Sequence, residues 1–151
     1  MATVAAEVEV PATPHAVWDL YFEQSLWPAW VDQFGVVLGI DGYPEVDGTL
    51  RWRSGRAGRG EVTERVLEHR QPERHRVRFA DPQAEGELAV SFAPAEGGAV
   101  VRQELAYHLR QGGPFVKVAD ALFVRSQMRL SLQRSLTAFA AEVVERSADG
   151  L

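Results

Sequence analysis

Alternation of apolar and polar residues dominates the middle of the chain. Between residues 34 and 110 hydrophobic positions recur at every second residue, which is typical of strands with one buried face. In the last such segment Val101, Leu105 and Leu109 alternate with polar or charged residues. Glycine, proline and aspartate pairs interrupt the pattern at short intervals, so successive strands are predicted to pair antiparallel. The pattern predicts strands at 34–40, 48–53, 60–69, 74–80, 86–93 and 99–110.

The N-terminal thirty residues predict one more strand and two short helices. Alternation over 3–10 indicates a strand that Pro11 ends. Thr13 and Pro14 then form a helix-start signal, an N-cap followed by proline at the first helical position. A second short helix or turn is predicted over 24–30, where Pro28 interrupts it.

A helical period replaces the alternation at the C-terminus, from Pro114 to Arg146. Its apolar stripe steps by three or four residues through Ala121, Val124, Met128, Leu132, Leu136, Phe139 and Val143. This helix is predicted to cover the apolar face of the sheet, in an α+β fold. About 33 helical residues would span roughly 50 Å. That exceeds the predicted strands, so a break or frayed ends is expected.

Composition narrows the classes of function. A chain of 151 residues is expected to form one domain over 1–151. It has no cysteine, which excludes disulfides, thiolate metal ligands and a cysteine nucleophile. A net charge of -5 argues against a nucleic-acid partner. Because neither a signal peptide nor a membrane span is predicted, a cytoplasmic location is expected.

Several motifs together resemble one known superfamily. They lie at 11–18 (PATPHAVW), 26–30 (LWPAW), 48–52 (GTLRW), 61–64 with 71–74, and 97–101, and in the final helix. The chain resembles the START-like, birch-pollen-allergen-type helix-grip superfamily and, within it, the polyketide cyclase/dehydrase-like (SRPBCC) group. The resemblance implies a curved seven-stranded antiparallel sheet that grips the last helix around an apolar cavity. Members of the superfamily share this cavity but not one reaction.

Aromatic residues are the most conspicuous candidates for the cavity wall. Either they fill the core or some of them contact a ligand, and tryptophan next to loops favours the mouth of a cavity. The aromatic candidates for ligand binding are Trp27, Trp30, Trp52, Phe79, Phe92 and Phe123.

Four further candidates lie on the apolar faces of the last strand and last helix. Gln103 and Tyr107 share the face of Val101, and a buried amide without a partner costs about 1–3 kcal/mol. A ligand or a neighbouring side chain could satisfy each. Met128 belongs to the helix stripe, and Arg125 lies at its edge. An inward Arg125 could hold a carboxylate or enolate oxygen, whereas an outward one would extend to solvent or pair with an acid.

The remaining charged residues and the histidines are expected to be structural. A ladder on the solvent face of the sheet is predicted from Glu61, Glu64, Glu68, Arg65, Arg70, Arg74, Arg76 and Arg78. The four histidines lack the spacing of a metal site, so no metal and no cofactor is expected. His15 and His108 are predicted to face outward.

Three functions remain open at this point. The first is binding of a hydrophobic or aromatic, lipid- or polyketide-like small molecule between sheet and helix. The second is a cyclase- or aromatase-type enzyme that uses the same cavity to fold a reactive chain. The third is a protein-interaction module. The expected partner is a hydrophobic ligand, and the chain is expected to be a monomer or a dimer.

Overall fold

The computed structural model describes residues 1–55, 58–110 and 118–148. Strand β1 (Ala2–Val10) is followed by helix α1 (Pro14–Tyr21), the 3-10 helix η1 (Gln24–Leu26) and helix α2 (Trp27–Trp30). Six further strands follow in the order β2 (Phe34–Asp41), β3 (Thr49–Ser54), β4 (Glu61–Arg70), β5 (Arg74–Ala80), β6 (Ala84–Ala95) and β7 (Gly98–Leu109). The long helix α3 (Val118–Ala148) closes the order of elements.

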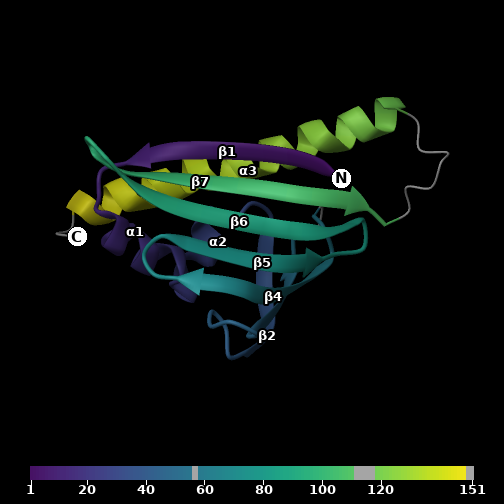
Figure 1. Cartoon of the computed structure of the whole chain (residues 1–151), viewed down its shortest axis with the longest axis horizontal. Helices are drawn as coiled ribbons and strands as arrows, with labels where there is room; N and C mark the ends of the chain where they lie inside the picture. The colour runs from purple at the N-terminus through teal and green to yellow at the C-terminus, as the bar shows by residue number, and fades with distance from the viewer. Residues whose placement is uncertain (56–57, 111–117, 149–151) are drawn as a thin grey trace.

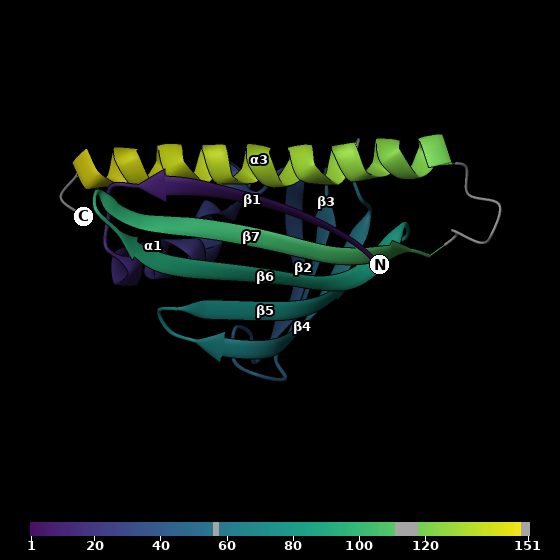
Figure 2. The same ribbon diagram turned by 45° about the horizontal axis from the view of Figure 1, so that its top comes forward.

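All seven strands form one antiparallel sheet in the order β1-β7-β6-β5-β4-β3-β2. The sheet curves, and α3 lies along β1 while α1 and α2 lie at one end (Figures 1 and 2). This is the helix-grip fold that the resemblance implied. The predicted strands are confirmed, and Thr13 caps α1 as expected by accepting a hydrogen bond from the Ala16 N–H at 3.3 Å.

Helix α3 is continuous from Val118 to Ala148, so the expected break is absent from its described length. Its excess length extends beyond the sheet at the N-terminal end (Figure 2). Two apolar residues in the N-terminal part of α3, Leu122 and Phe123, have exposed fractions of 61% and 65%. The start predicted at Pro114 lies outside the described residues.

Two apolar clusters form the core. The larger joins α1, α2, the sheet and the C-terminal half of α3 around Phe139, which is fully buried. The smaller packs Phe79, Leu105 and Tyr107 against Leu132 of α3. Residues of both clusters line the cavity described below, so the core is divided by open space.

A β-bulge in β4 decides which of its residues face the interior. Val66 pairs with Val77 and Glu68 pairs with Arg76, which leaves Leu67 without a partner of its own. An unpaired residue shifts the alternation by one position. As a result His69, which would otherwise face solvent, lies on the inner face opposite His75.

The prediction for one residue of β4, Glu64, is wrong. Glu64 was expected in the solvent-facing charge ladder, but its side chain points into the protein, where it meets the indole of Trp52. The physical reason is parity, because Glu64 lies midway between buried Val62 and Val66 before the bulge. The rest of the ladder is found on the outer face, with ion pairs such as Arg74 to Glu68 at 2.9 Å.

Candidate ligand-binding site

A cavity of about 110 Å³ lies between the sheet, α2 and α3. It adjoins a groove of about 280 Å³ beside the N-terminal half of α3, because both are lined by Arg59, Glu64, Leu88 and Leu132. The two spaces therefore share part of their walls. The groove is bordered by the exposed Phe123, and we call it the mouth of the cavity.

Aromatic rings form much of the inner wall. Trp30 of α2 packs against Tyr21 and Phe139 with ring centroids 4.8 and 4.9 Å apart. Trp52 of β3 stacks on Phe34 at 5.4 Å and 20°. Rings held this way keep a rigid, apolar lining. The wall therefore favours a flat or apolar ligand.

Unpartnered polar atoms interrupt this apolar lining. Within the described residues four buried side-chain polar atoms lack a hydrogen-bond partner, and three of them belong to residues that line the cavity. They are the Trp30 Nε1, Gln103 Oε1 and His75 Nε2 atoms. Leaving such a group unpaired costs about 1–3 kcal/mol, so each is a position where a bound group would be stabilised.

Gln103 is held in place by Tyr21. Its amide nitrogen donates to the Tyr21 hydroxyl oxygen at 2.9 Å, and its exposed fraction is only 4%. Burial raises the pKa of Tyr21 above its usual value, with the Gln103 hydrogen bond acting in the opposite direction. The phenol consequently stays neutral, and the Oε1 atom of Gln103, a residue of the cavity wall, is left without a hydrogen-bond partner.

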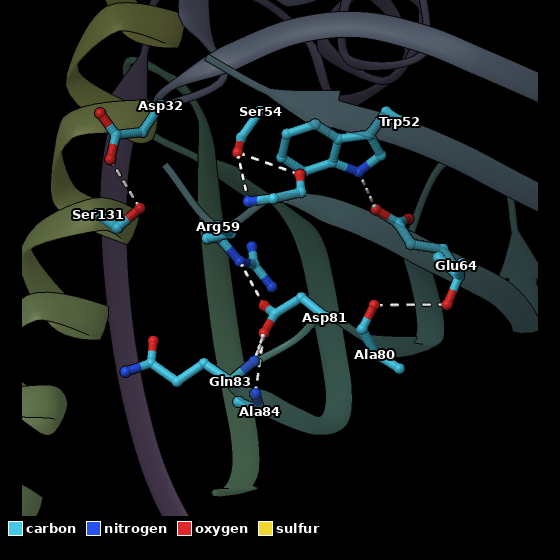
Figure 3. Close-up of polar contacts among 12 residues, drawn as sticks. Asp32, Trp52, Ser54, Arg59, Glu64, Ala80, Asp81, Gln83, Ala84 and Ser131 are labelled. Atoms are coloured by element: carbon cyan, nitrogen blue, oxygen red, sulfur yellow. Dashed lines mark hydrogen bonds and ion pairs between the residues drawn. The ribbon is translucent and has the colours of Figure 1, made fainter. Parts of the chain in front are cut away.

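Glu64 supplies an acid to the same space. The Trp52 indole nitrogen donates to Glu64 Oε2 at 3.1 Å (Figure 3). Burial raises the pKa of Glu64, while the Trp52 hydrogen bond and the charge of Arg59 lower it less. Because the carboxyl faces the cavity, part of its surface stays accessible although it is removed from bulk water. Glu64 can therefore accept, or when protonated donate, a hydrogen bond to a ligand.

Arg59 borders both the inner cavity and the groove. Its Nε donates to Asp81 Oδ2 at 2.8 Å (Figure 3). Its guanidinium lies 5.3 Å from the centre of the Phe79 ring. The other oxygen of Asp81 accepts the backbone N–H groups of Gln83 and Ala84, both at 2.8 Å. Asp81 thus fixes Arg59 at the boundary between cavity and mouth.

Two serines of α3 connect the helix to the segment after α2. The Ser131 hydroxyl donates to Asp32 Oδ2 at 2.8 Å (Figure 3). The Asp32 backbone N–H donates to Ser135 Oγ, also at 2.8 Å. All three residues line the inner cavity. These bonds hold α3 against the segment that carries Trp27 and Trp30.

His75 and His69 meet on the inner face of the β4–β5 hairpin. Their Nδ1 atoms lie 3.0 Å apart, and His75 packs against Phe22 with ring centroids 4.7 Å apart. Burial lowers the pKa of His75 to about 3, with the nearby His69 acting in the same direction. His75 is therefore neutral at physiological pH.

The ten predicted ligand residues fall into three groups. Trp27, Trp30, Trp52 and Gln103 line the inner cavity. Phe79, Phe123 and Met128 line the groove. The remaining three line neither of these two spaces. Phe92 and Tyr107 are buried in the core clusters, and Arg125 lies exposed on α3.

Sequence reasoning missed several cavity residues. The parity of Glu64 with Val62 and Val66 was a usable signal. His75 shares its alternation with Val77 and could have been found in the same way. No local signal distinguishes Arg59, Asp32 or Tyr43, because these lie in connecting segments whose direction depends on the whole fold.

A larger open groove of about 860 Å³ lies on the outer face of the sheet. Several of its charged residues are paired with other side chains, as in Arg51 with Glu61 at 3.4 Å and His108 with Glu85 at 2.8 Å. Satisfied, solvated pairs offer little to a ligand. The smaller inner cavity, with its unpartnered atoms, is the better candidate.

Two kinds of feature are absent from the part of the chain that the structure describes. It contains no group of three or more histidine, aspartate or glutamate residues placed to hold a metal ion. No helix in it is long and apolar enough to cross a membrane.

Solved structures share this fold at low sequence identity, whereas curated protein sequences yield no significant match. TTHA0849 from Thermus thermophilus is 22% identical with a TM-score of 0.70, over 97% of this chain and 99% of that one. A Thalictrum norcoclaurine synthase point mutant is 16% identical with a TM-score of 0.68, over 97% and 96%.

The di-domain ARO/CYC protein StfQ from the steffimycin biosynthetic pathway has a TM-score of 0.76 at 11% identity. The match covers 97% of this chain and 51% of StfQ, so the chain spans about half of that protein. At these identities the similarity concerns the fold alone. The family model described as polyketide cyclase / dehydrase and lipid transport matches residues 1–144, and the chain therefore belongs to that family.

Proposed function

We propose that this protein binds a hydrophobic or aromatic small molecule between the sheet and α3, with the polar end of the ligand innermost. The observation that carries the proposal is the set of unpartnered atoms on Trp30, His75 and Gln103 in an otherwise aromatic wall. An apolar lining supplies affinity, and a few convergent polar groups supply orientation. Membership of a family described by cyclisation, dehydration and lipid transport supports this class of ligand.

The dimensions of the space suggest how such a ligand would lie. The inner cavity of about 110 Å³ suits one small ring, and the groove of about 280 Å³ accepts the remainder. A hydroxyl or carbonyl on the inner ring would meet Trp30 as donor and Gln103 as acceptor. Phe79 and Met128 would cover the part of the ligand that lies in the mouth.

The second candidate function is a cyclase- or aromatase-type enzyme. Glu64 favours it, because burial raises the pKa of this carboxyl and so makes it a stronger base than an exposed carboxylate. The names of StfQ and norcoclaurine synthase, whose fold is shared, add support. A protein-interaction module has less support, since the cavity is not filled by side chains. A cytoplasmic location and the absence of a nucleic-acid partner remain proposals.

Thermal unfolding in the presence of small aromatic probes tests the binding function. The probes are indole, 2-naphthol, naphthalene and palmitate. They allow an aromatic ring with a polar group, an aromatic ring without one, and an aliphatic chain to be compared. A probe at a hundred times its Kd stabilises the fold by about 2.7 kcal/mol, or roughly 5–10 °C in Tm. We expect 2-naphthol to bind more tightly than naphthalene, because only the former reaches the unpartnered atoms.

A matched pair of variants locates the binding. Leu88 lines both cavity and groove, so Leu88→Trp is expected to abolish the shift. Leu122→Trp makes the same change at an exposed position of α3 and should leave it intact. Equal shifts in both variants, or no shift with any probe, would contradict the proposal.

A further inference from the structure

The two histidines of the β4–β5 hairpin share one hydrogen bond between like atoms. His69 and His75 are cross-strand partners whose Nδ1 atoms lie 3.0 Å apart. A neutral imidazole carries one proton on one of its two nitrogens. One Nδ1 must therefore donate to the other, so the position of the proton on one ring decides its position on the other.

The two imidazole rings of this pair lie in different surroundings. His75 has an exposed fraction of 4%, lines the cavity and leaves its Nε2 atom buried without a partner. His69 is partly exposed and packs against Trp18, with ring centroids 4.9 Å apart and the ring planes inclined by 44°. The pair thus leads from the inner cavity to the surface of the protein.

We propose that His75 and His69 form a proton relay between the cavity and solvent, in which His75 Nε2 removes a proton from a bound ligand or returns one to it. The substrate class is a molecule with an acidic proton on its inner ring, such as a phenol or an enolisable ketone. The inference rests on the proposed function, because the cavity must admit the ligand.

The step needs no reactant other than solvent water, which accepts the released proton. In the starting arrangement His75 carries its proton on Nδ1 and His69 carries one on Nε2. The ligand proton moves to His75 Nε2, the Nδ1 proton of His75 moves to His69 Nδ1, and the Nε2 proton of His69 passes to water. The ligand keeps the electron pair of the broken bond. The reverse movement delivers a proton to the ligand.

The surroundings explain why two rings are needed. Phe22 and Tyr43 enclose His75, with ring centroids 4.7 and 5.6 Å away, and an imidazolium there would be poorly solvated. A relay lets His75 gain one proton while it loses another, so the ring need not hold a charge. The other ionisable groups around the pair are Tyr21, Glu45 and Glu64.

Nitrogen-15 NMR of the free, full-length protein tests the pair without a ligand. A proton shared by two nitrogens produces a scalar coupling between them, so we expect a coupling between the Nδ1 atoms of His69 and His75 at neutral pH. His69→Phe keeps the aromatic stacking and should abolish the coupling. Absence of the coupling in the unmodified protein would overturn the relay.

The elimination of 5-nitrobenzisoxazole tests proton transfer inside the cavity. A base takes the proton on C3, that electron pair forms the nitrile, and the N–O bond breaks to give a coloured phenolate. A positioned base accelerates such a step by roughly 100-fold or more, so His75→Phe should lower the rate of the bound probe by about that factor. His69→Phe should lower it by at least about tenfold if His69 removes the proton from His75.

Controls separate the possible failures. His15→Gln alters an exposed histidine and should change nothing. If Glu64→Gln abolishes turnover while His75→Phe does not, Glu64 is the base and the relay is wrong. Shifts of the Trp30 indole resonance show whether the probe binds. If the probe binds but its turnover does not depend on His75, the relay is wrong and the proposed function is unaffected. No binding by any aromatic probe overturns the proposed function and the ligand step together.

Discussion

The indole N–H of Trp52 donates a hydrogen bond to Glu64 inside the cavity, with 3.1 Å between Nε1 and Oε2. The two residues lie on neighbouring strands, β3 and β4, with both side chains on the inner face. The bond orients a carboxyl group that burial makes harder to ionise. Glu64 is therefore a buried carboxyl group with a fixed orientation and a raised pKa.

Glu64→Gln is expected to stabilise the protein at neutral pH. The folded protein binds the Glu64 proton more tightly than the unfolded chain, whose pKa is near the ordinary value of 4.5. Ionisation above that value therefore costs folding free energy, and the cost is complete once the pH exceeds the raised pKa. Glutamine keeps an acceptor for Trp52 and removes the charge. The gain in Tm should be present at neutral pH and should disappear below pH 4.5.

Glu61→Gln is the matched control, because Glu61 lies on the same strand with its side chain in solvent beside Arg51. Thermal unfolding of both variants across this pH range makes the comparison. A gain for Glu64→Gln that is the same at all pH values, or a loss at neutral pH, would contradict the burial argument.

Ser135→Ala should weaken the attachment of α3 to the segment that follows α2. The substitution leaves the Asp32 N–H without its acceptor, which costs about 1–3 kcal/mol. For a domain of this size each 1 kcal/mol corresponds to roughly 2–4 °C in Tm. Ser126→Ala alters an exposed serine on the same helix and should have little effect. Equal Tm values for the two variants would show that the bond contributes nothing.

The Tyr21–Gln103 bond should be visible as a coupling free energy. Tyr21→Phe and Gln103→Leu each leave a buried polar group unpaired, whereas the double variant removes both groups. Its loss of stability should be smaller than the sum of the single losses by about 1 kcal/mol. Urea unfolding measures all four proteins. Pairing Tyr21→Phe with Gln133→Leu, an exposed glutamine of α3, should give strictly additive losses.

The ion pair at the mouth of the cavity should matter more than an exposed one. Arg59→Met removes the charged partner of Asp81, whose side chain is only 1% exposed, and leaves it with two backbone donors. Because Arg59 itself reaches solvent, we expect a loss of about 1–2 kcal/mol. Arg51→Met breaks an exposed pair with Glu61 and should cost less than about 1 kcal/mol. Denaturant unfolding of both variants measures the difference.

Most of the fold could be predicted because several of its strands alternate regularly between inward and outward residues. In β7 Val101, Gln103 and Leu105 point inward while Arg102 and Glu104 point outward, as expected from period two. Gln103 was recognisable as a site residue for the same reason, since a polar side chain at an apolar position stands out. The helix stripe through Leu136 and Phe139 predicted the packing of α3 equally well.

The rest of the site depends on relations that one sequence does not display. Glu64 was misplaced because its charge resembled that of the outward-facing Glu61 and Glu68, although its parity matched that of buried Val62. His69 faces inward because of a β-bulge, and no residue type in this segment predicts that bulge. Arg59 and Asp32 reach the cavity from loops, and their positions follow from the paths of distant strands and of α3.

The unpaired Leu67 has a consequence for how this site could change over generations. Deletion of that single residue would place Glu68 directly after Val66, so the strand would alternate regularly with Glu68 still outward and His69 still opposite His75. A one-codon deletion at the bulge would therefore leave the inner wall unchanged. This makes the bulge a position where related proteins could differ in length while keeping the same pair of imidazoles.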